Sequence, residues 1–285
     1  MKYLLIPLQC ILAMSKVNFQ TAFGKKAVKT SADALLFNVF VFVFSALLFM
    51  PSVFGCSGPV WIYASVAAMF TVLYQFFYTK ALSRGNVSLT VLIVNFAMVI
   101  NVLVSYILFD EPISLLRLCG IVLTVVSFFV CTRFDDKKKS SKVWLLLALL
   151  SMLTSAGGSV TNKFFGESAY GTENSAYVSA LYIVAALLVT VYYLILKKKG
   201  EKTTFKINFN MIKYALAVGI SLAVYQFVYT YSLRVIDGTL LFPTVTGGCV
   251  ILAALSGVLI FKDKLTKRQI YGMILGIISI VMMTF

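Results

Sequence analysis

Long apolar stretches, separated by short polar segments, run along the whole chain. Most are about twenty residues long, which is the length that an α-helix needs to cross the hydrocarbon core of a membrane. The strands of a membrane barrel would be about ten residues long and alternate between apolar and polar positions. The sequence therefore predicts an all-α membrane protein of about ten transmembrane helices, over 3–23, 34–50, 59–82, 87–109, 115–132, 143–162, 175–196, 211–233, 239–261 and 269–285.

The composition also points to a membrane protein. Hydrophobic residues make up 60% of the chain and charged residues 12%, whereas about a quarter of the residues in a soluble domain are charged. The net charge of +15 raises the alternative of a nucleic-acid partner, but the Lys and Arg residues lie in short clusters between apolar stretches, as they do beside membrane spans. We expect the lipid bilayer as the surroundings, no nucleic-acid partner, and a location in the plasma (inner) membrane of a bacterium.

The residues that most enzymes and metal sites use are scarce here. The sequence contains no histidine, its five cysteines form no C-x-x-C pair, and its ten acidic residues fall near the ends of the predicted helices or between them. A zinc site or a nucleophile paired with a base is therefore not expected. We predict that the protein is not an enzyme and has no cofactor and no metal. The lack of a deep carboxylate also favours a facilitator or exchanger over a proton-coupled pump.

Two halves of the chain resemble each other. The segment YQFFYTKAL at 74–82 matches YQFVYTYSL at 225–233 in six of nine positions, and FDEPIS at 109–114 corresponds to FKDKLT at 261–266. These matches predict two repeats of five helices each, over 1–136 and 137–285. Because five is an odd number, the second repeat enters the membrane in the opposite orientation. Inverted repeats of this kind are typical of secondary transporters.

The repeated residues make the chain similar to the drug/metabolite transporter superfamily, EamA type. They comprise an aromatic residue, an acid, a hydroxyl and a glycine in each half, and a lysine at the end of the first helix: Phe109, Glu111, Ser114, Gly120, Phe261, Asp263, Thr266, Gly272, Lys25 or Lys26, and Lys163. The resemblance implies two five-helix repeats that move a small metabolite. The family often has a proline in the fourth helix of each repeat. Here Asn95 lies near that place in the first repeat, and Pro243 lies slightly before it in the second. The usual tryptophan–glycine pair of the first helix is absent. The resemblance does not identify the substrate.

The basic residues predict an orientation. Most Lys and Arg residues lie in the segments after the first, third, fifth, seventh and ninth spans. The excess of positive charge in cytoplasmic loops then places these segments in the cytoplasm and both chain ends outside. Relatives of this type are commonly drawn with cytoplasmic ends, and we follow the charge distribution.

Lys16 is the main candidate for contact with a substrate. It lies near the middle of the first predicted span, where an ammonium costs a few kcal/mol or more unless it faces water or a partner. It is either a contact for an anionic group of the substrate or a lysine that extends to the membrane surface. Polar residues on the first, fourth and ninth spans are predicted to share its site or, alternatively, to form ordinary hydrogen bonds between helices: Asn18, Gln20, Asn95, Asn101, Thr244 and Thr246. Pro243 with Gly247 and Gly248 predicts an irregular ninth helix.

The repeated aromatic segments are candidate gates. Each has two tyrosines and a glutamine at helical spacing, Tyr74, Gln75 and Tyr78 in the first half and Tyr225, Gln226 and Tyr229 in the second. Inversion predicts them at opposite mouths of a pathway, as gates or walls, and the alternative is an aromatic belt at the membrane surface.

Two further pairs of residues give structural predictions. Glu111 and Asp263 precede the fifth and tenth helices, where a carboxylate suits the helix N-terminus. Gly272 and Gly276 form a G-x-x-x-G pattern, for which contact within the monomer is favoured over a homodimer.

These features together predict a function. A secondary transporter or exporter would move a small polar or amphipathic metabolite by alternating access. A flippase for a lipid or a lipid-linked sugar is the alternative within transport, and it would need a groove open sideways to the bilayer. A structural or signalling membrane protein would leave the inverted repeat unused.

Overall fold

A computed structural model describes residues 2–27, 30–84, 87–131, 141–201, 204, 207–259 and 266–284. Within these residues the chain is helical and contains no strand, which confirms the prediction of an all-α membrane protein. The α-helices are α1 (Leu5–Ala27), α2 (Ser31–Leu48), α3 (Gly58–Arg84), α4 (Val87–Asn95), α5 (Ala97–Leu108), α6 (Leu115–Cys131), α7 (Lys142–Glu167), α8 (Asn174–Lys198), α9 (Phe209–Val235), α10 (Gly238–Leu259) and α11 (Lys267–Thr284). Short 3₁₀ turns lie at Lys2–Leu4, Met50–Val53 and Gly171–Glu173.

The helices have the lengths and surfaces that a membrane requires. In the described residues, the segments Gly58–Leu82, Leu89–Leu108, Lys142–Glu167, Gly171–Lys198 and Phe209–Val235 are long and apolar enough to cross it. Large apolar side chains also point outward, and Ile62, Ile107 and Leu187 are more than 60% exposed. An apolar outer surface of this extent needs lipid rather than water around it.

The predicted irregular helix is in the fourth span and not in the ninth. α10 continues through Pro243, which lies in its second turn and removes a single donor from the helix. The fourth span instead divides into α4 and α5 at Phe96, where the backbone N–H of Phe96 donates to the Ile93 carbonyl and that of Val99 donates to the Phe96 carbonyl. These tighter bonds end one helix and start the next.

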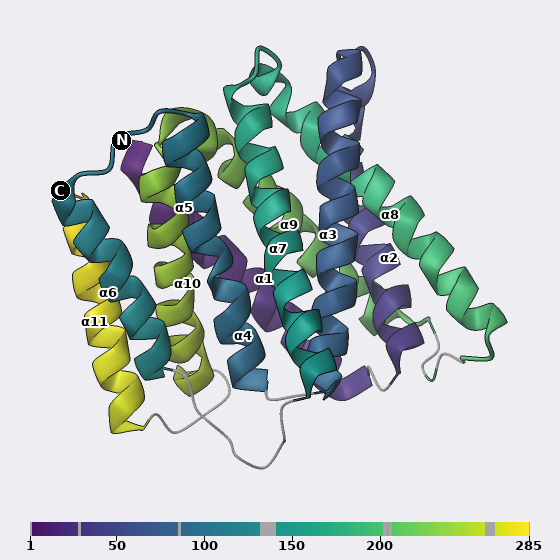
Figure 1. The fold of residues 1–285 in the computed structure, drawn as a ribbon. Helices are drawn as coiled ribbons and strands as arrows, with labels where there is room; N and C mark the ends of the chain where they lie inside the picture. Colours follow the sequence, from purple (N-terminus) through teal and green to yellow (C-terminus); the bar gives the residue numbers. More distant parts are fainter. Residues whose placement is uncertain are drawn as a thin grey trace.

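Most of the helices form a closed ring (Figure 1). Going around it, α10 packs on α1, α1 on α9, α9 on α2, α2 on α8, α8 on α3, α3 on α7, and α7 on α4 and α5, while α5 returns to α10. α6 and α11 pack against each other outside the ring, and α11 also contacts α10. In the two halves α1 corresponds to α7, α2 to α8, α3 to α9, α4 and α5 together to α10, and α6 to α11. Replacing each helix by its counterpart gives the same ring in reverse order. The helix packing therefore has the repeat that the sequence predicted.

The contact between α6 and α11 shows that the repeat is inverted. Ser127 on α6 donates from its hydroxyl to the Gly272 carbonyl at 2.7 Å, and a Cβ on Gly120 would lie 3.0 Å from the Ser279 carbonyl oxygen. Gly120 and Gly272 are equivalent in the repeat, as are Ser127 and Ser279, so the equivalent glycine and serine positions face each other twice across the pair of helices, as expected for inverted copies. Gly276 also faces Ser127, which means that the G-x-x-x-G pattern is used within the monomer.

The bundle has two different ends. α1 begins and α11 ends at the upper end in Figure 1, while α6 ends and α7 begins at the lower end. The described basic residues at the starts of α7 and α11, Lys142, Lys267 and Arg268, therefore lie at the lower end. The predicted boundary between the halves, at 136/137, lies outside the described residues, so the division into two domains stays a prediction.

Candidate functional site

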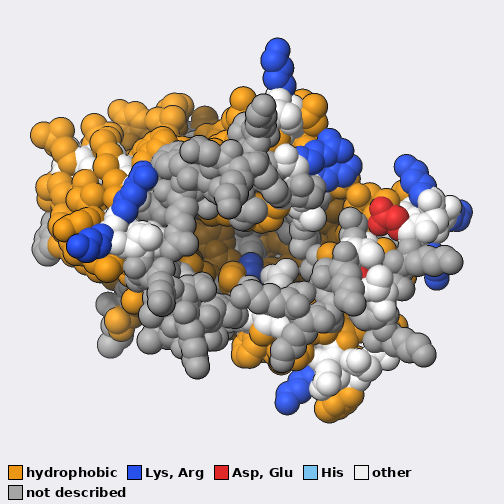
Figure 2. Space-filling view, turned by 90° about the horizontal axis from the view of Figure 1, so that it is seen from below, with side chains coloured by type: hydrophobic (Ala, Val, Ile, Leu, Met, Phe, Trp, Pro, Cys, Tyr) orange, Lys and Arg blue, Asp and Glu red, His pale blue; other side chains and the backbone are white. Residues whose placement is uncertain are grey.

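A cavity with two chambers lies at the centre of the helix ring. The main chamber, of about 250 Å³, is lined from α1, α2, α3, α7, α8 and α9. The second, of about 210 Å³, is lined from α3, α4, α5, α7, α9 and α10. The two chambers share five lining residues, Tyr74, Ser155, Ser159, Tyr225 and Tyr229. Figure 2, seen from the lower end, shows that the molecule is hollowed at its centre. Both halves of the chain thus contribute walls to one cavity.

Lys16 on α1 lines the main chamber. Its Nζ lies 5.7 Å from the centre of the Tyr225 ring, a cation–π contact. Neither chamber has an aspartate or a glutamate among its described lining residues. The ammonium of Lys16 therefore faces neutral groups in a region that the bilayer surrounds.

Amide side chains surround the same chamber. Gln20, Asn38 and Gln75 line it, as do Asn162 and Gln226. The Asn162 Oδ1 accepts from the Tyr177 hydroxyl at 2.6 Å and from the Gln226 Nε2 at 2.9 Å. Because these two amides bond to each other, they form a fixed polar wall, and this wall holds hydrogen-bonding groups in the cavity.

The second chamber has its own polar groups. Asn95, at the end of α4, and Asn101 and Thr246 line it. Asn101 is 5% exposed, and within the described residues its Oδ1 has no hydrogen-bond partner. A buried amide oxygen without a partner costs free energy unless a ligand or water donates to it. Asn101 is thus placed to accept a hydrogen bond from a bound molecule.

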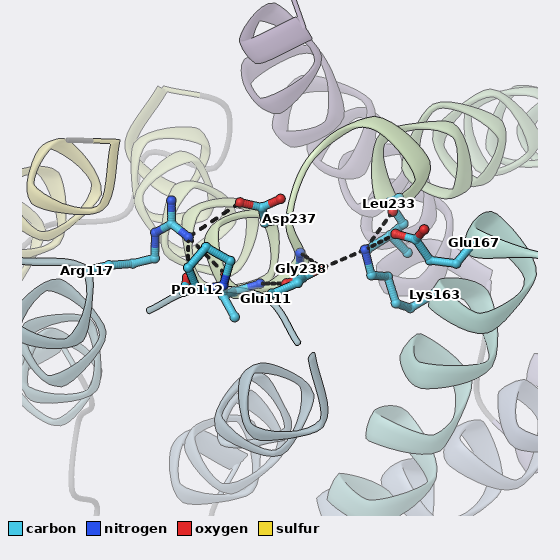
Figure 3. A network of polar contacts seen from close by, with 9 residues as sticks. Glu111, Pro112, Arg117, Lys163, Glu167, Leu233, Asp237 and Gly238 are labelled. Carbon is cyan, nitrogen blue, oxygen red and sulfur yellow. Dashed lines mark hydrogen bonds and ion pairs between the residues drawn. The ribbon is translucent and has the colours of Figure 1, made fainter. Parts of the chain in front are cut away.

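At the upper end, Lys163 on α7 lies in a buried network of charges (Figure 3). It is 2% exposed. Its Nζ lies 2.7 Å from the Glu111 Oε1 and 2.6 Å from the Glu167 Oε1, and it donates to the Leu233 carbonyl at 3.0 Å. The network joins the segment before α6, the end of α7 and the end of α9. It therefore ties these helices together at the end opposite the hollow.

Glu111 also holds the start of α10. Its two carboxylate oxygens accept the backbone N–H groups of Gly238 at 2.9 Å and Thr239 at 2.8 Å. These groups carry the positive end of the helix dipole, which a carboxylate stabilises. The preceding residue, Asp110, has a φ of 49°, a left-handed conformation that Asp tolerates better than most residues.

Glu111 was predicted to cap the fifth span, α6, or to line the turn before it. It lies in that turn, but the prediction that it caps α6 was wrong. Ser114 takes this role, because its Oγ accepts the backbone N–H of Arg117 in the first turn of α6. The carboxylate of Glu111 is thus free to reach α10. Its counterpart Asp263 lies outside the described residues, as do Phe261 and the side chains of Lys25 and Lys26.

A second charged contact lies beside the first. The Arg117 Nη1 lies 3.6 Å from the Asp237 Oδ2, and it donates to the Thr239 hydroxyl at 3.0 Å and the Pro112 carbonyl at 2.9 Å. Arg117 thereby joins the start of α6 to the start of α10. Both contacts hold α10 against the segment that links α5 and α6.

Comparison with known proteins identifies the first half of this arrangement. Residues 5–133 match the model of the EamA-like transporter family. This part of the chain is therefore similar to that family. The EamA-like family is part of the drug/metabolite transporter superfamily, as the repeated residues predicted, and it is a family of transporters rather than enzymes. The match indicates an integral membrane protein that transports.

The whole chain also has the fold of a solved structure. A crystal structure described only as that of a protein aligns with 99% of this chain and 95% of its own, with a TM-score of 0.75 and 17% sequence identity. At this identity the likeness concerns the fold alone. No curated protein matches the chain in sequence.

Most of the residues predicted to contact a substrate line the cavity. Lys16 and Gln20 line the main chamber, and Asn95, Asn101 and Thr246 line the second. Their contact with a substrate stays a prediction.

Two of the predicted substrate contacts lie elsewhere. Thr244 is fully buried away from both chambers, and its hydroxyl donates to the Leu240 carbonyl of its own helix at 2.7 Å. Asn18 is also absent from the described lining of both chambers. It lies only two residues from Lys16, and a step of two residues turns a helix by about 200°.

The repeated tyrosines meet in one cavity instead of lying at opposite mouths. Within each pair the rings stack, with centres 5.3 Å apart for Tyr74 and Tyr78 and 5.6 Å apart for Tyr225 and Tyr229. Tyr74, Tyr225 and Tyr229 line both chambers, Gln75 and Gln226 line the main one, and Tyr78 is absent from the lining of both. Tyr74 and Tyr225 lie in the middle third of α3 and α9, and inversion keeps points near the midplane close together. This position favours walls of the pathway, and a gating role stays a prediction.

Several residues of the site did not stand out in the sequence. Ser155, Ser159 and Asn162 on α7 line the cavity at a spacing of four and then three residues, so a polar stripe on the sixth span was a usable signal. Lys163 resembled a family feature, but its pairing with Glu111 joins residues 52 positions apart, and no periodic pattern reveals such a contact.

Proposed function

We propose that the protein is a secondary transporter that moves a small polar or amphipathic metabolite across the membrane by alternating access. The observation that carries this proposal is a polar cavity between two inverted halves, hollowed toward one end, with a buried network of charges that ties the helices together at the other. Each chamber is smaller than the pockets of about 300–1,000 Å³ that hold drug-sized ligands. A metabolite fits this size better than a lipid-linked sugar does.

The upper end supports alternating access. At that end Lys163 pairs with Glu111 and Glu167, and Glu111 bonds to the first turn of α10, so the helices there are tied together. For the upper end to open, Lys163 has to separate from Glu111 while α10 moves. Since the helix ring maps onto itself when the halves exchange, an equivalent closure at the lower end would produce the opposite state.

The proposed orientation places the lower end in the cytoplasm of a bacterial cell, at the plasma (inner) membrane. The basic residues at the starts of α7 and α11 support it. In this orientation the structure represents the state open to the cytoplasm. The proposed working unit is one chain, supported by a cavity that one chain encloses.

Access to the cavity from each side tests the mechanism. We expect Ser159→Cys, in a background without the native cysteines, to react with a membrane-impermeant thiol reagent from the cytoplasmic side, because Ser159 lines both chambers. Glu111→Gln, which weakens the closed end, should increase labelling from the opposite side. Ser179→Cys is the matched control that should stay unlabelled, because Ser179 is fully buried and donates to the Ala46 carbonyl.

Counterflow of metabolites in proteoliposomes completes the test. Labelling of Ser159→Cys at equal rates from both sides in every background would indicate a channel and would contradict alternating access. Transfer of labelled lipid between leaflets, with no counterflow of water-soluble metabolites, would instead favour the flippase.

A further inference from the structure

Lys16 is a half-buried cation inside the helix ring, and the described residues supply no counter-charge for it. Within the described residues no hydrogen bond or ion pair reaches its Nζ, and its contact is the ring of Tyr225 at 5.7 Å. A cation–π contact returns only part of what an ammonium loses on leaving water. The main chamber into which Lys16 faces therefore has a positive potential that favours an anionic ligand.

The rest of the cavity indicates what surrounds that anionic group. The other described lining residues are neutral: amides, hydroxyls, and the aromatic rings of Phe42, Phe70, Tyr74, Tyr182 and Tyr229. No carboxylate among them would hold a ligand ammonium, and no second cation would hold another negative charge. The charge balance thus fits a ligand with one negative charge and an uncharged body.

The position of Lys16 fits a ligand that extends across both chambers. Tyr225, beneath the ammonium, lines both chambers, so Lys16 lies next to their junction. Asn101 lines the second chamber with a buried oxygen that has no hydrogen-bond partner among the described residues. A molecule with an anionic group at one end and a hydrogen-bond donor at the other would satisfy both groups.

We infer that the cavity binds an amphipathic monocarboxylate, with its carboxylate on Lys16 and its uncharged body against the tyrosines. This inference rests on the proposed transport function and adds the substrate class to it. It excludes free amino acids as preferred substrates, because their ammonium would lie near Lys16 with no acid to compensate it.

Binding of two matched series to the purified protein tests the inference. The first contains 3-(4-hydroxyphenyl)propanoate, its primary amide, the corresponding propylamine, and tyrosine; the second contains hexanoate, hexanamide and hexylamine. We expect the acids to bind about tenfold more tightly than their amides, as one charge-assisted hydrogen bond predicts. The amines and tyrosine should bind more weakly still. Binding of each compound is measured by thermal shift and by equilibrium binding.

Variants attribute the effect to Lys16. Lys16→Met should remove the preference for the acids, and Lys16→Arg should keep most of it. Lys213→Met is the control, because Lys213 is an exposed lysine on α9 outside the cavity. The inference is overturned if the amides bind as tightly as the acids, if the preference survives in Lys16→Met, or if no acid of either series binds.

Counterflow of the same probes separates this inference from the proposed function. Transport of neutral or zwitterionic probes without Lys16-dependent binding of acids would leave the transporter standing and reject the substrate class. Binding of the acids that depends on Lys16, with no counterflow, would leave the site standing and reject transport.

Discussion

Two lysines lie inside the helical bundle, in very different surroundings. Lys163 at the upper end contacts Glu111, Glu167 and the Leu233 carbonyl within 3.0 Å. Lys16 in the central cavity contacts a tyrosine ring. A buried cation with two carboxylates stabilises the contact between the helices that carry them. A half-buried cation without a carboxylate partner, such as Lys16, adds nothing comparable to the fold, and it becomes useful when a ligand brings the missing charge.

The upper end of the bundle and the central cavity differ in the same way as the two lysines. At the upper end, Glu111 binds both Lys163 and the N-terminus of α10, so one carboxylate ties three segments of the chain together. In the cavity, the polar groups come from helices of both halves and leave space between them. Polar and charged side chains that are paired thus hold the upper end together, whereas those of the cavity are left open to a ligand.

The largest expected effect is on stability, from Lys163→Met. This change leaves Glu111 buried with its charge no longer balanced by Lys163, and breaking a buried ion pair on one side typically costs about 3–5 kcal/mol. We expect a marked fall in the unfolding temperature of the purified protein. Lys16→Met should leave that temperature unchanged or raise it, because it removes a cation without a counter-charge. Equal destabilisation by both variants would contradict the comparison.

Removing both charges at the upper end should recover much of this loss. In the double variant Glu111→Met, Lys163→Met no unpaired ion of this pair remains buried, and such replacements are often close to neutral. Glu111 also caps α10, so we expect a residual loss of about 1 kcal/mol from the missing cap. A double-mutant cycle measured by thermal unfolding gives the coupling, and strict additivity would mean that the two residues do not interact.

An intermediate effect is expected in transport when the tyrosine walls are removed. Tyr225→Ala takes away the ring beneath Lys16, and we expect KM to rise about 3- to 10-fold. Tyr74→Ala should also lower transport, because Tyr74 lines both chambers. Tyr231→Ala on the exposed side of α9 is the control. Unchanged kinetics in the first two variants would show that these tyrosines neither gate nor line the pathway.

The smallest effect separates two neighbouring threonines. Both hydroxyls donate to a carbonyl of their own helix, but Thr246 lines the second chamber whereas Thr244 is fully buried away from it. We expect Thr246→Val to reduce transport two- to threefold, the loss of about 0.5 kcal/mol for a weak hydrogen bond. Thr244→Val should leave transport at the wild-type rate. If Thr244→Val reduced transport in a proteoliposome assay and Thr246→Val did not, the cavity would have to lie on the Thr244 side of α10.

Predictions from the sequence succeeded where one residue and its neighbours along the helix were enough. The lengths of the spans, the inverted repeat and the unusual position of Lys16 all follow from patterns within a helix or between the two copies. The prediction for Glu111 failed because two helix starts compete for its carboxylate, and Ser114 already caps the nearer one. The prediction that the tyrosine pairs lie at opposite mouths failed because inversion separates only residues near the helix ends. Tyr74 and Tyr225 lie in the middle third of α3 and α9.

By itself, the sequence determined that the chain is helical, lies in a membrane and repeats with inversion, because hydrophobic length and internal similarity are properties of the linear chain. Only the tertiary structure decided that Lys16 faces a cavity without an acid, and that Lys163 meets Glu111. Helical spacing tells which residues share a face, but the neighbour of that face depends on how distant helices pack.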